Sequence, residues 1–223
     1  MNKGLVITID GPAGAGKSTV SKALAARLSY RYLDTGAFYR AFAYKAKQEG
    51  ILPGDDEKLA ALGRCLKISF QNMDGQLLLF LDDREVTSEM IRTEEIGLLA
   101  SAISARPCVR QALLEMQREA GRQGGIVAEG RDMGTVVFPD ADVKFFLDAA
   151  AAERVQRRYR EIETREAAVD RERVEKELLF RDKQDREREA APLKPAAQAH
   201  IIDTTNLTVE EVVNKMAALI TSL

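Results

Sequence analysis

The chain has little of what several common enzyme classes need. It holds one histidine, His200, which excludes a metal site built on several histidines and disfavours a His-based catalytic triad. Its two cysteines, Cys65 and Cys108, show no metal-binding spacing, and we expect two buried, reduced thiols. Its longest apolar run, residues 77–81, is too short to cross a bilayer, and residues 5–10 resemble a strand rather than a leader. We therefore expect a cytoplasmic protein without a membrane partner.

An excess of one charge is also missing. The chain has 33 Lys and Arg against 35 Asp and Glu, which gives a net charge of -2 and predicts no nucleic-acid partner. With 223 residues, 45% of them hydrophobic, it is long enough for one sizeable core. We expect one domain over residues 1–223, and a monomer, because no large exposed apolar stripe is evident.

Strand and helix patterns alternate along most of the sequence. Short apolar runs typical of buried strands fall at 5–10, 30–33, 126–128, 143–147 and 200–203, with helical patterns between them. This order predicts an α/β fold with a five-stranded parallel sheet core flanked by helices.

Two segments depart from that alternation. Residues 66–70 alternate apolar and polar side chains, 72–75 supply a turn and 76–81 run back, which predicts an antiparallel hairpin within an insert at about 55–105. Residues at about 150–170 form a helical segment dense in arginine. Arginine suits bidentate phosphate contacts, so we interpret this segment as a lid, although many of its charges will form ion pairs with neighbouring acids.

The strongest motif is the glycine-rich segment 11–18, which fits G-x-x-x-x-G-K-[ST] with a strand before it and a helix after it. Such a P-loop turns its backbone N–H groups toward phosphate oxygens, and the helix adds its positive end. We expect Lys17 to reach the β- and γ-phosphates of ATP, Ser18 to bind Mg²⁺ and Thr19 to support the α-phosphate. The predicted ATP-binding residues are Gly11, Pro12, Ala13, Gly14, Ala15, Gly16, Lys17, Ser18 and Thr19.

The P-loop alone leaves the fate of the γ-phosphate open. A GTPase would carry N-K-x-D, but the closest string, 214–217, lacks the aspartate and falls in a helical pattern. A motor or transporter ATPase is usually larger. A small-molecule kinase needs a second anion site and a cover that excludes water. A nucleotide-binding regulatory module without transfer activity is the alternative from another class.

Candidates for the second anion site follow two predicted strands. Thr35 and Arg40 lie just after residues 30–33, and Arg131 and Asp132 lie just after 126–128. Because the carboxyl ends of parallel strands meet at one edge of a sheet, these residues are candidates for a shared site. The candidates for contact with the transferring phosphoryl group are the lid residues Arg154, Arg157, Arg158 and Arg160.

These strings resemble the bacterial cytidylate kinase family of P-loop nucleotide kinases. The resemblance runs over nearly the whole chain and is carried by segments 7–19, 33–41, 91–96, 129–149, 181–188, 191–193 and 202–205. It implies a nucleotide kinase fold, with a parallel sheet core, a small antiparallel insert and an arginine-rich helical lid. It also implies transfer of the γ-phosphoryl group of ATP, with Mg²⁺, to CMP or dCMP.

The resemblance implies further roles for residues of this chain. Thr35, Tyr39 and Arg40 would position the acceptor nucleotide, and Arg110 and Arg131 would hold phosphate. Ser101, Arg110 and Asp132 would read cytosine. A carboxylate can accept from the cytosine amino group, whereas uracil presents an acceptor at that position. The remaining implied residues are Arg181, Asp185 and Arg188 near the sugar and phosphate, and Arg92 in the insert.

Two positions depart from the family pattern. Phe38 stands where methionine is common, and Gln198 stands where an acidic residue is common; both are interpreted as packing or surface positions. A kinase of the same fold acting on UMP or shikimate remains an alternative at this point.

Overall fold

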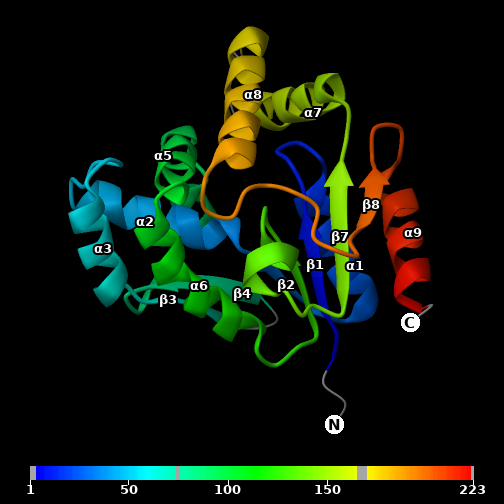
Figure 1. Cartoon of the computed structure of the whole chain (residues 1–223), viewed down its shortest axis with the longest axis horizontal. Helices are drawn as coiled ribbons and strands as arrows, with labels where there is room; N and C mark the ends of the chain where they lie inside the picture. Colours follow the sequence, from blue (N-terminus) through cyan, green and yellow to red (C-terminus); the bar gives the residue numbers. More distant parts are fainter. Residues whose placement is uncertain (1–3, 74–75, 165–169, 222–223) are drawn as a thin grey trace. The chain divides into compact units, whose positions relative to one another are not determined.

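The structure of the chain is a computed structural model that describes residues 4–73, 76–164 and 170–221. It forms two compact units (Figure 1). The first consists of Met1–Leu33 and Gly124–Leu223, and the second of Asp34–Gln123. The predicted bounds of the insert (55–105) and of the lid (150–170) remain predictions.

The first unit is built on the expected five-stranded sheet, in the order β2-β6-β1-β7-β8. Strand β1 is central and pairs in parallel with β6 and β7, and β7 pairs in parallel with β8. Strand β1 lies between β6 and β7, and its last four residues are buried, as is typical of a central parallel strand. The P-loop follows directly after its last residue, Asp10. The strands are β1 (Val6–Asp10), β2 (Arg31–Asp34), β6 (Ile126–Glu129), β7 (Val143–Asp148) and β8 (His200–Asp203).

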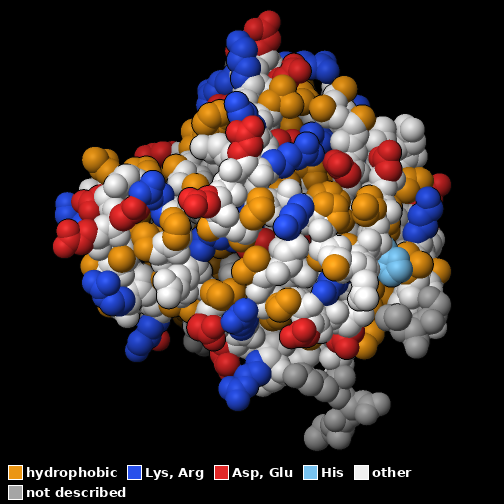
Figure 2. Space-filling view, viewed as in Figure 1, with side chains coloured by type: hydrophobic (Ala, Val, Ile, Leu, Met, Phe, Trp, Pro, Cys, Tyr) orange, Lys and Arg blue, Asp and Glu red, His pale blue; other side chains and the backbone are white. Residues whose placement is uncertain are grey.

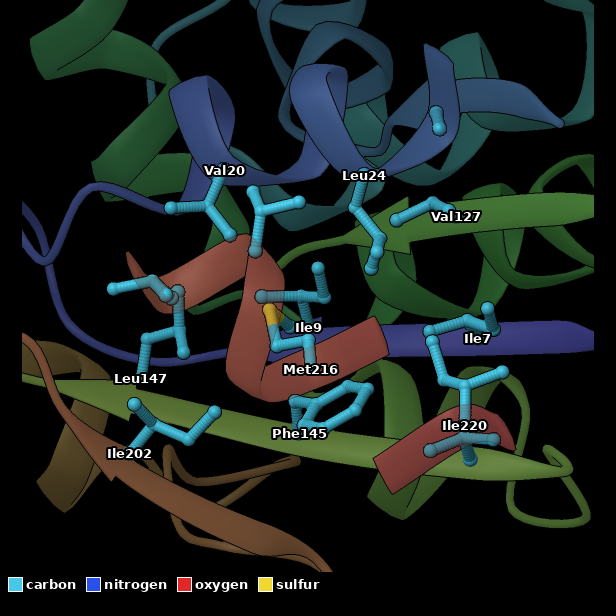
Figure 3. Packing of buried hydrophobic residues seen from close by; sticks show 14 of the residues in the cluster. Ile7, Ile9, Val20, Leu24, Val127, Phe145, Leu147, Ile202, Met216 and Ile220 are labelled. Carbon is cyan, nitrogen blue, oxygen red and sulfur yellow. The ribbon is translucent and has the colours of Figure 1, made fainter. Parts of the chain in front are cut away.

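Helices α1 and α9 bury their apolar faces against this sheet. Val20 and Leu24 of α1 and Met216 of α9 converge on Ile9 and Phe145 of the strands (Figure 3). Thr208 and Glu211 form the expected capping box, in which each accepts from the backbone N–H of the other. The helical elements of this unit are α1 (Lys17–Leu28), the π-helix η1 (Met133–Val137), α7 (Ala151–Glu163), α8 (Arg171–Glu187) and α9 (Val209–Thr221).

The second unit contains the expected hairpin, extended by a short strand into a three-stranded antiparallel sheet in the order β3-β4-β5. Asp74 and Gly75 of the predicted turn lie outside the described residues. Helix α6 begins at Pro107, where the missing N–H of proline costs no intrahelical bond. The elements are α2 (Gly36–Gln48), α3 (Asp56–Cys65), β3 (Ile68–Met73), β4 (Gln76–Leu81), β5 (Arg84–Glu85), α4 (Ser88–Ile91), α5 (Glu94–Ser104) and α6 (Pro107–Gly121).

The prediction of two buried cysteines is wrong in part. Both thiols are free, but Cys65 is exposed and Cys108 only partly buried. Cys65 lies in the last turn of α3, past the buried Leu59 and Leu62, so the apolar face of the helix does not include it. Phe38 is buried against the ring of Phe70, and Gln198 is exposed, as expected for packing and surface positions.

The surface of the chain carries charges of both signs. Figure 2 shows Lys and Arg side chains interspersed with Asp and Glu side chains over α7 and α8. Several are ion pairs one helical turn apart, such as Arg173 with Glu177 and Arg158 with Glu161. Among the described residues, no helix combines the length and the apolar character that a membrane span requires.

Candidate active site

The P-loop connects the end of β1 to the start of α1. Gly11 and Gly16 both have positive φ angles, 148° and 84°. A Cβ on Gly11 would lie 2.0 Å from the carbonyl oxygen of Leu147 in β7, so only glycine fits there. Gly16 is the N-cap of α1, and the first N–H groups of that helix have no intrahelical acceptor. The loop therefore ends at an anion-binding helix terminus.

Lys17 is buried at this terminus. Its Nζ donates to the carbonyl oxygen of Pro12 at 2.6 Å. Burial, and next the charge of Arg131, lower the pKa of Lys17 to about 7, while Glu129 and Asp185 oppose the shift. The negative charge of a polyphosphate beside Nζ would favour the ammonium form of Lys17, as the carboxylates of Glu129 and Asp185 do.

Asp10, the last residue of β1, ties this strand to the segment that follows β6. Its two carboxylate oxygens accept hydrogen bonds from the backbone N–H groups of Met133 and Gly134, both at 2.8 Å. Its side chain is almost fully buried, which raises its pKa to about 6, although the two N–H groups act in the opposite direction. Asp10 thus fixes the backbone immediately after Arg131 and Asp132.

Arg131 and Asp132 belong to a chain of alternating charges with α8. Arg131 Nε donates to Asp185 at 2.8 Å, and Arg188 contacts the other oxygen of Asp185 at 3.3 Å. Arg188 also lies 3.8 Å from Asp132, which is buried. The structure therefore brings four predicted site residues into one cluster.

Arg181 lies one turn before Asp185 on α8. Its Nε is buried and has no hydrogen-bond partner in the described part of the chain. Burial lowers the pKa of Arg181, and the nearby positive charge of Arg158 lowers it further. An anion bound beside these two arginines would relieve both unfavourable effects.

The arginines of α7 differ in their surroundings. Arg154 is buried and donates to Ala149 O and to Ala13 O, each at 3.0 Å. Arg157 donates to Thr204, at 3.0 Å to its hydroxyl and 2.7 Å to its carbonyl oxygen. Arg158 pairs with Glu161 at 2.8 Å, and Arg160 is exposed.

The second unit gathers the other predicted residues. Asp34 accepts from Arg40 at 2.6 Å and from Arg92 at 2.5 Å. Thr35 is buried at the N-cap of α2. The guanidinium of Arg110 stacks over the ring of Tyr39, 5.4 Å from its centre. Ser101 is half-buried in α5. The candidate residues are thus divided between the two units, and in the second unit the contacts join Asp34 with Arg40 and Arg92, and Tyr39 with Arg110.

Sequence reasoning missed the acids that hold these arginines and loops. Asp10, Asp34 and Asp182 were not predicted as site residues. The position of Asp10 and Asp34 at the carboxyl ends of β1 and β2 is a signal that could have found them. Asp182 has no such signal, because its partners lie far away in the sequence.

The parallel sheet and the P-loop that follows β1 define the class of the protein as a P-loop α/β protein. A shikimate kinase from Bacteroides thetaiotaomicron has a similar fold, with a TM-score of 0.51 and 13% identity over 97% of this chain and 98% of that chain. A structure of an uncharacterized protein from Eubacterium ventriosum is similar at a TM-score of 0.53 and 12% identity, over 98% and 99%.

Sequence comparison gives the particular family. Residues 7–222 match the cytidylate kinase family model, and the chain belongs to this family. It is 54% identical to the cytidylate kinase of Citrifermentans bemidjiense over 96% of this chain and 91% of that protein. It is 47% identical to that of Geobacter sulfurreducens, over 98% and 93%, and 44% identical to that of Pasteurella multocida, over 96% and 93%.

Proposed function

We propose that this protein transfers the γ-phosphoryl group of ATP to CMP, and also to dCMP, giving ADP and CDP or dCDP. The observation that carries the proposal is the cluster of Arg131, Asp185, Arg188 and Asp132 in the unit that holds the P-loop. Membership of the cytidylate kinase family over nearly the full chain supports the choice of acceptor.

The P-loop and Lys17 bind the triphosphate of ATP. An oxygen of the CMP phosphate attacks the γ-phosphorus, a new O–P bond forms, and the bond to the β–γ bridging oxygen breaks as ADP leaves. This oxygen is already a nucleophile, so no strong general base is required, and catalysis consists of alignment and charge stabilisation. Lys17 and Arg131 supply positive charge, and Arg157 and Arg158 are candidates for contact with the transferring group.

Roles toward the acceptor are assigned within each unit separately. We assign phosphate binding to Arg131 and Arg181, ribose contacts to Asp185 and Arg188, and cytosine reading to Asp132. Asp132 is buried, and a carboxylate there can accept from the cytosine amino group. In the second unit we assign acceptor contacts to Thr35, Tyr39, Arg40, Arg92, Ser101 and Arg110. We also propose that the segment at about 55–105 is a nucleotide-binding insert and the segment at about 150–170 a lid, that the protein acts as a monomer and that it is cytoplasmic.

The donor set suits Mg²⁺ bound mainly through nucleotide phosphates. Ser18 lies exposed at the first turn of α1, and no group of three or more His, Cys, Asp or Glu side chains among the described residues could hold a metal by itself. Mg²⁺ commonly keeps several waters and takes one or two protein ligands beside substrate phosphates, so Ser18 would hold it. When bound, Mg²⁺ neutralises charge on the phosphates.

Coupled ADP release with ATP and Mg²⁺ tests the proposal, with CMP, dCMP, UMP, AMP, GMP and shikimate offered separately. We expect fast turnover confined to CMP and dCMP. A Lys17→Met preparation, purified in parallel, controls for contaminating kinases. Turnover with a different acceptor would overturn the assignment of Asp132, and ATP binding without any turnover would favour a regulatory module.

A further inference from the structure

A buried ion pair holds one residue of the P-loop, Ala13, at both its backbone N–H and its carbonyl oxygen. The N–H of Ala13 donates to Asp182 of α8 at 3.3 Å, and its carbonyl oxygen accepts from Arg154 of α7 at 3.0 Å. Arg154 and Asp182 are also hydrogen-bonded to each other. Their exposed fractions are 4% and 6%. Ala13, Arg154 and Asp182 are therefore joined pairwise by three hydrogen bonds.

The surroundings keep Arg154 in this position. Its Nε donates to Ala149 O at 3.0 Å, just before α7 begins. A Cβ on Gly14 would lie 2.7 Å from Arg154 O and 2.9 Å from its Cβ, so the first turn of α7 packs directly on the P-loop. With its guanidinium occupied by two carbonyl oxygens and a carboxylate, Arg154 is committed to the loop backbone.

Helix α8 makes a second connection three residues further on. Asp182 and Asp185 are spaced i,i+3 and lie on the same side of the helix. Asp182 holds the P-loop, whereas Asp185 holds Arg131. One rigid helix thus connects the phosphate-binding loop to the segment that we assign to the acceptor.

We propose that Asp182, together with Arg154, is a positioning residue that fixes the P-loop in its ATP-binding conformation by holding the backbone N–H and the carbonyl oxygen of Ala13. In this role neither side chain needs to reach the reacting atoms, because both are bound to the loop backbone and to each other. The sequence suggests that Arg154 contacts the transferring phosphoryl group, and we propose the positioning role in place of that contact. The proposal rests on the use of the P-loop for ATP that the proposed function requires, but not on the identity of the acceptor.

The test uses the full chain and two readouts that need no acceptor. The first is hydrogen exchange at the Ala13 amide, measured by NMR, and the second is ATP affinity, measured by titration calorimetry without CMP. Asp182→Asn keeps an oxygen that can accept from Ala13 but removes the charge that faces Arg154. The matched control is Glu187→Gln on the same helix, where Glu187 forms an exposed pair with Lys183 at 4.0 Å.

We expect Asp182→Asn to speed exchange at Ala13 and to weaken ATP binding by about tenfold or more, because it leaves a buried charge unpaired beside the loop. The control should differ from wild type by less than about twofold, as expected for an exposed pair. Unchanged exchange at Ala13, or faster exchange with unchanged ATP affinity, would overturn the proposal.

A second variant covers the case in which Asp182→Asn does not fold. Arg154→Met with Asp182→Leu removes both charges and fills the space with apolar atoms, which often preserves stability. A folded double variant with weakened ATP binding and faster exchange at Ala13 supports positioning, and one that binds ATP like wild type overturns it. Because neither readout uses CMP, failure to phosphorylate CMP would refute the proposed function and leave this result intact.

Discussion

Asp185 accepts a hydrogen bond from Arg131 at 2.8 Å and also contacts Arg188 at 3.3 Å. Burial by itself would raise the pKa of Asp185, but the charges of Arg131 and Arg188 outweigh it and hold the pKa below its usual value. One ionised carboxylate therefore orients two guanidinium groups, one after β6 and one at the end of α8.

Asp185→Asn should release both arginines from this arrangement. Removing one partner of a buried, hydrogen-bonded charge pair costs about 2–5 kcal/mol. We expect kcat/KM for CMP to fall by about two orders of magnitude. Steady-state kinetics with CMP varied at saturating ATP checks this, with Glu187→Gln as the control on the same helix. An unchanged kcat/KM would remove Asp185 from acceptor binding.

Lys17 should take up a proton when ATP binds. At pH 8 the lysine, with its pKa lowered to about 7, is mostly neutral in the free protein, and the phosphates of ATP favour the ammonium form. ATP itself is fully ionised at pH 8. We expect uptake approaching one proton, measured by titration calorimetry in buffers of different ionisation enthalpy. Lys17→Met should abolish the uptake and lower kcat by about 10²-fold or more.

The lowered pKa of Lys17 also makes the free energy of unfolding depend on pH. The pKa of Lys17 is lower in the folded state than its usual value of 10.5, so the unfolded chain binds more protons between about pH 7 and 10.5. The contribution of Lys17 to the free energy of unfolding therefore rises with pH in that window. Absence of proton uptake in the wild-type protein at pH 8 would contradict both expectations.

Asp10 should destabilise the fold as it ionises. Its folded-state pKa is about 6, against 3.8 in the unfolded chain, so the folded state binds more protons between these values. Its contribution to stability is fully present below pH 3.8 and falls by about 3 kcal/mol as the pH rises through 6. Urea unfolding at pH 4 and pH 7.5 should show this fall in wild type relative to Asp10→Asn. The exposed Asp140→Asn, compared in the same way, should track wild type, and an equal pH dependence in Asp10→Asn would refute the expectation.

Asp132→Asn should weaken the choice of CMP over UMP. A carboxylate accepts from the cytosine amino group, whereas an asparagine can also donate to the carbonyl oxygen of uracil. We expect the ratio of kcat/KM for CMP and UMP to fall by about 10- to 100-fold, corresponding to about 1–3 kcal/mol. Competition between the two nucleotides measures the ratio directly. A ratio equal to that of wild type would exclude Asp132 from base reading.

The sequence by itself determined the features that depend on local chemistry. The sheet follows from short apolar runs alternating with helical patterns, and the P-loop from glycines at positions where positive φ or close packing forbids a side chain. The hairpin and the capping box at Thr208 follow from turn and cap preferences. Each strand, loop, turn and cap signal is contained within a stretch of fewer than about 20 residues, so one sequence is enough to detect it.

Only the tertiary structure decided what each charged side chain binds. A sequence presents Arg154, Arg157 and Arg158 as equivalent lid cations, but burial against Ala13 and Asp182 commits Arg154 to the P-loop backbone. The pairing of Ala13 with Asp182 joins residues 169 positions apart. Such contacts leave no local pattern, because a buried charge takes whatever partner the packed chain brings to it.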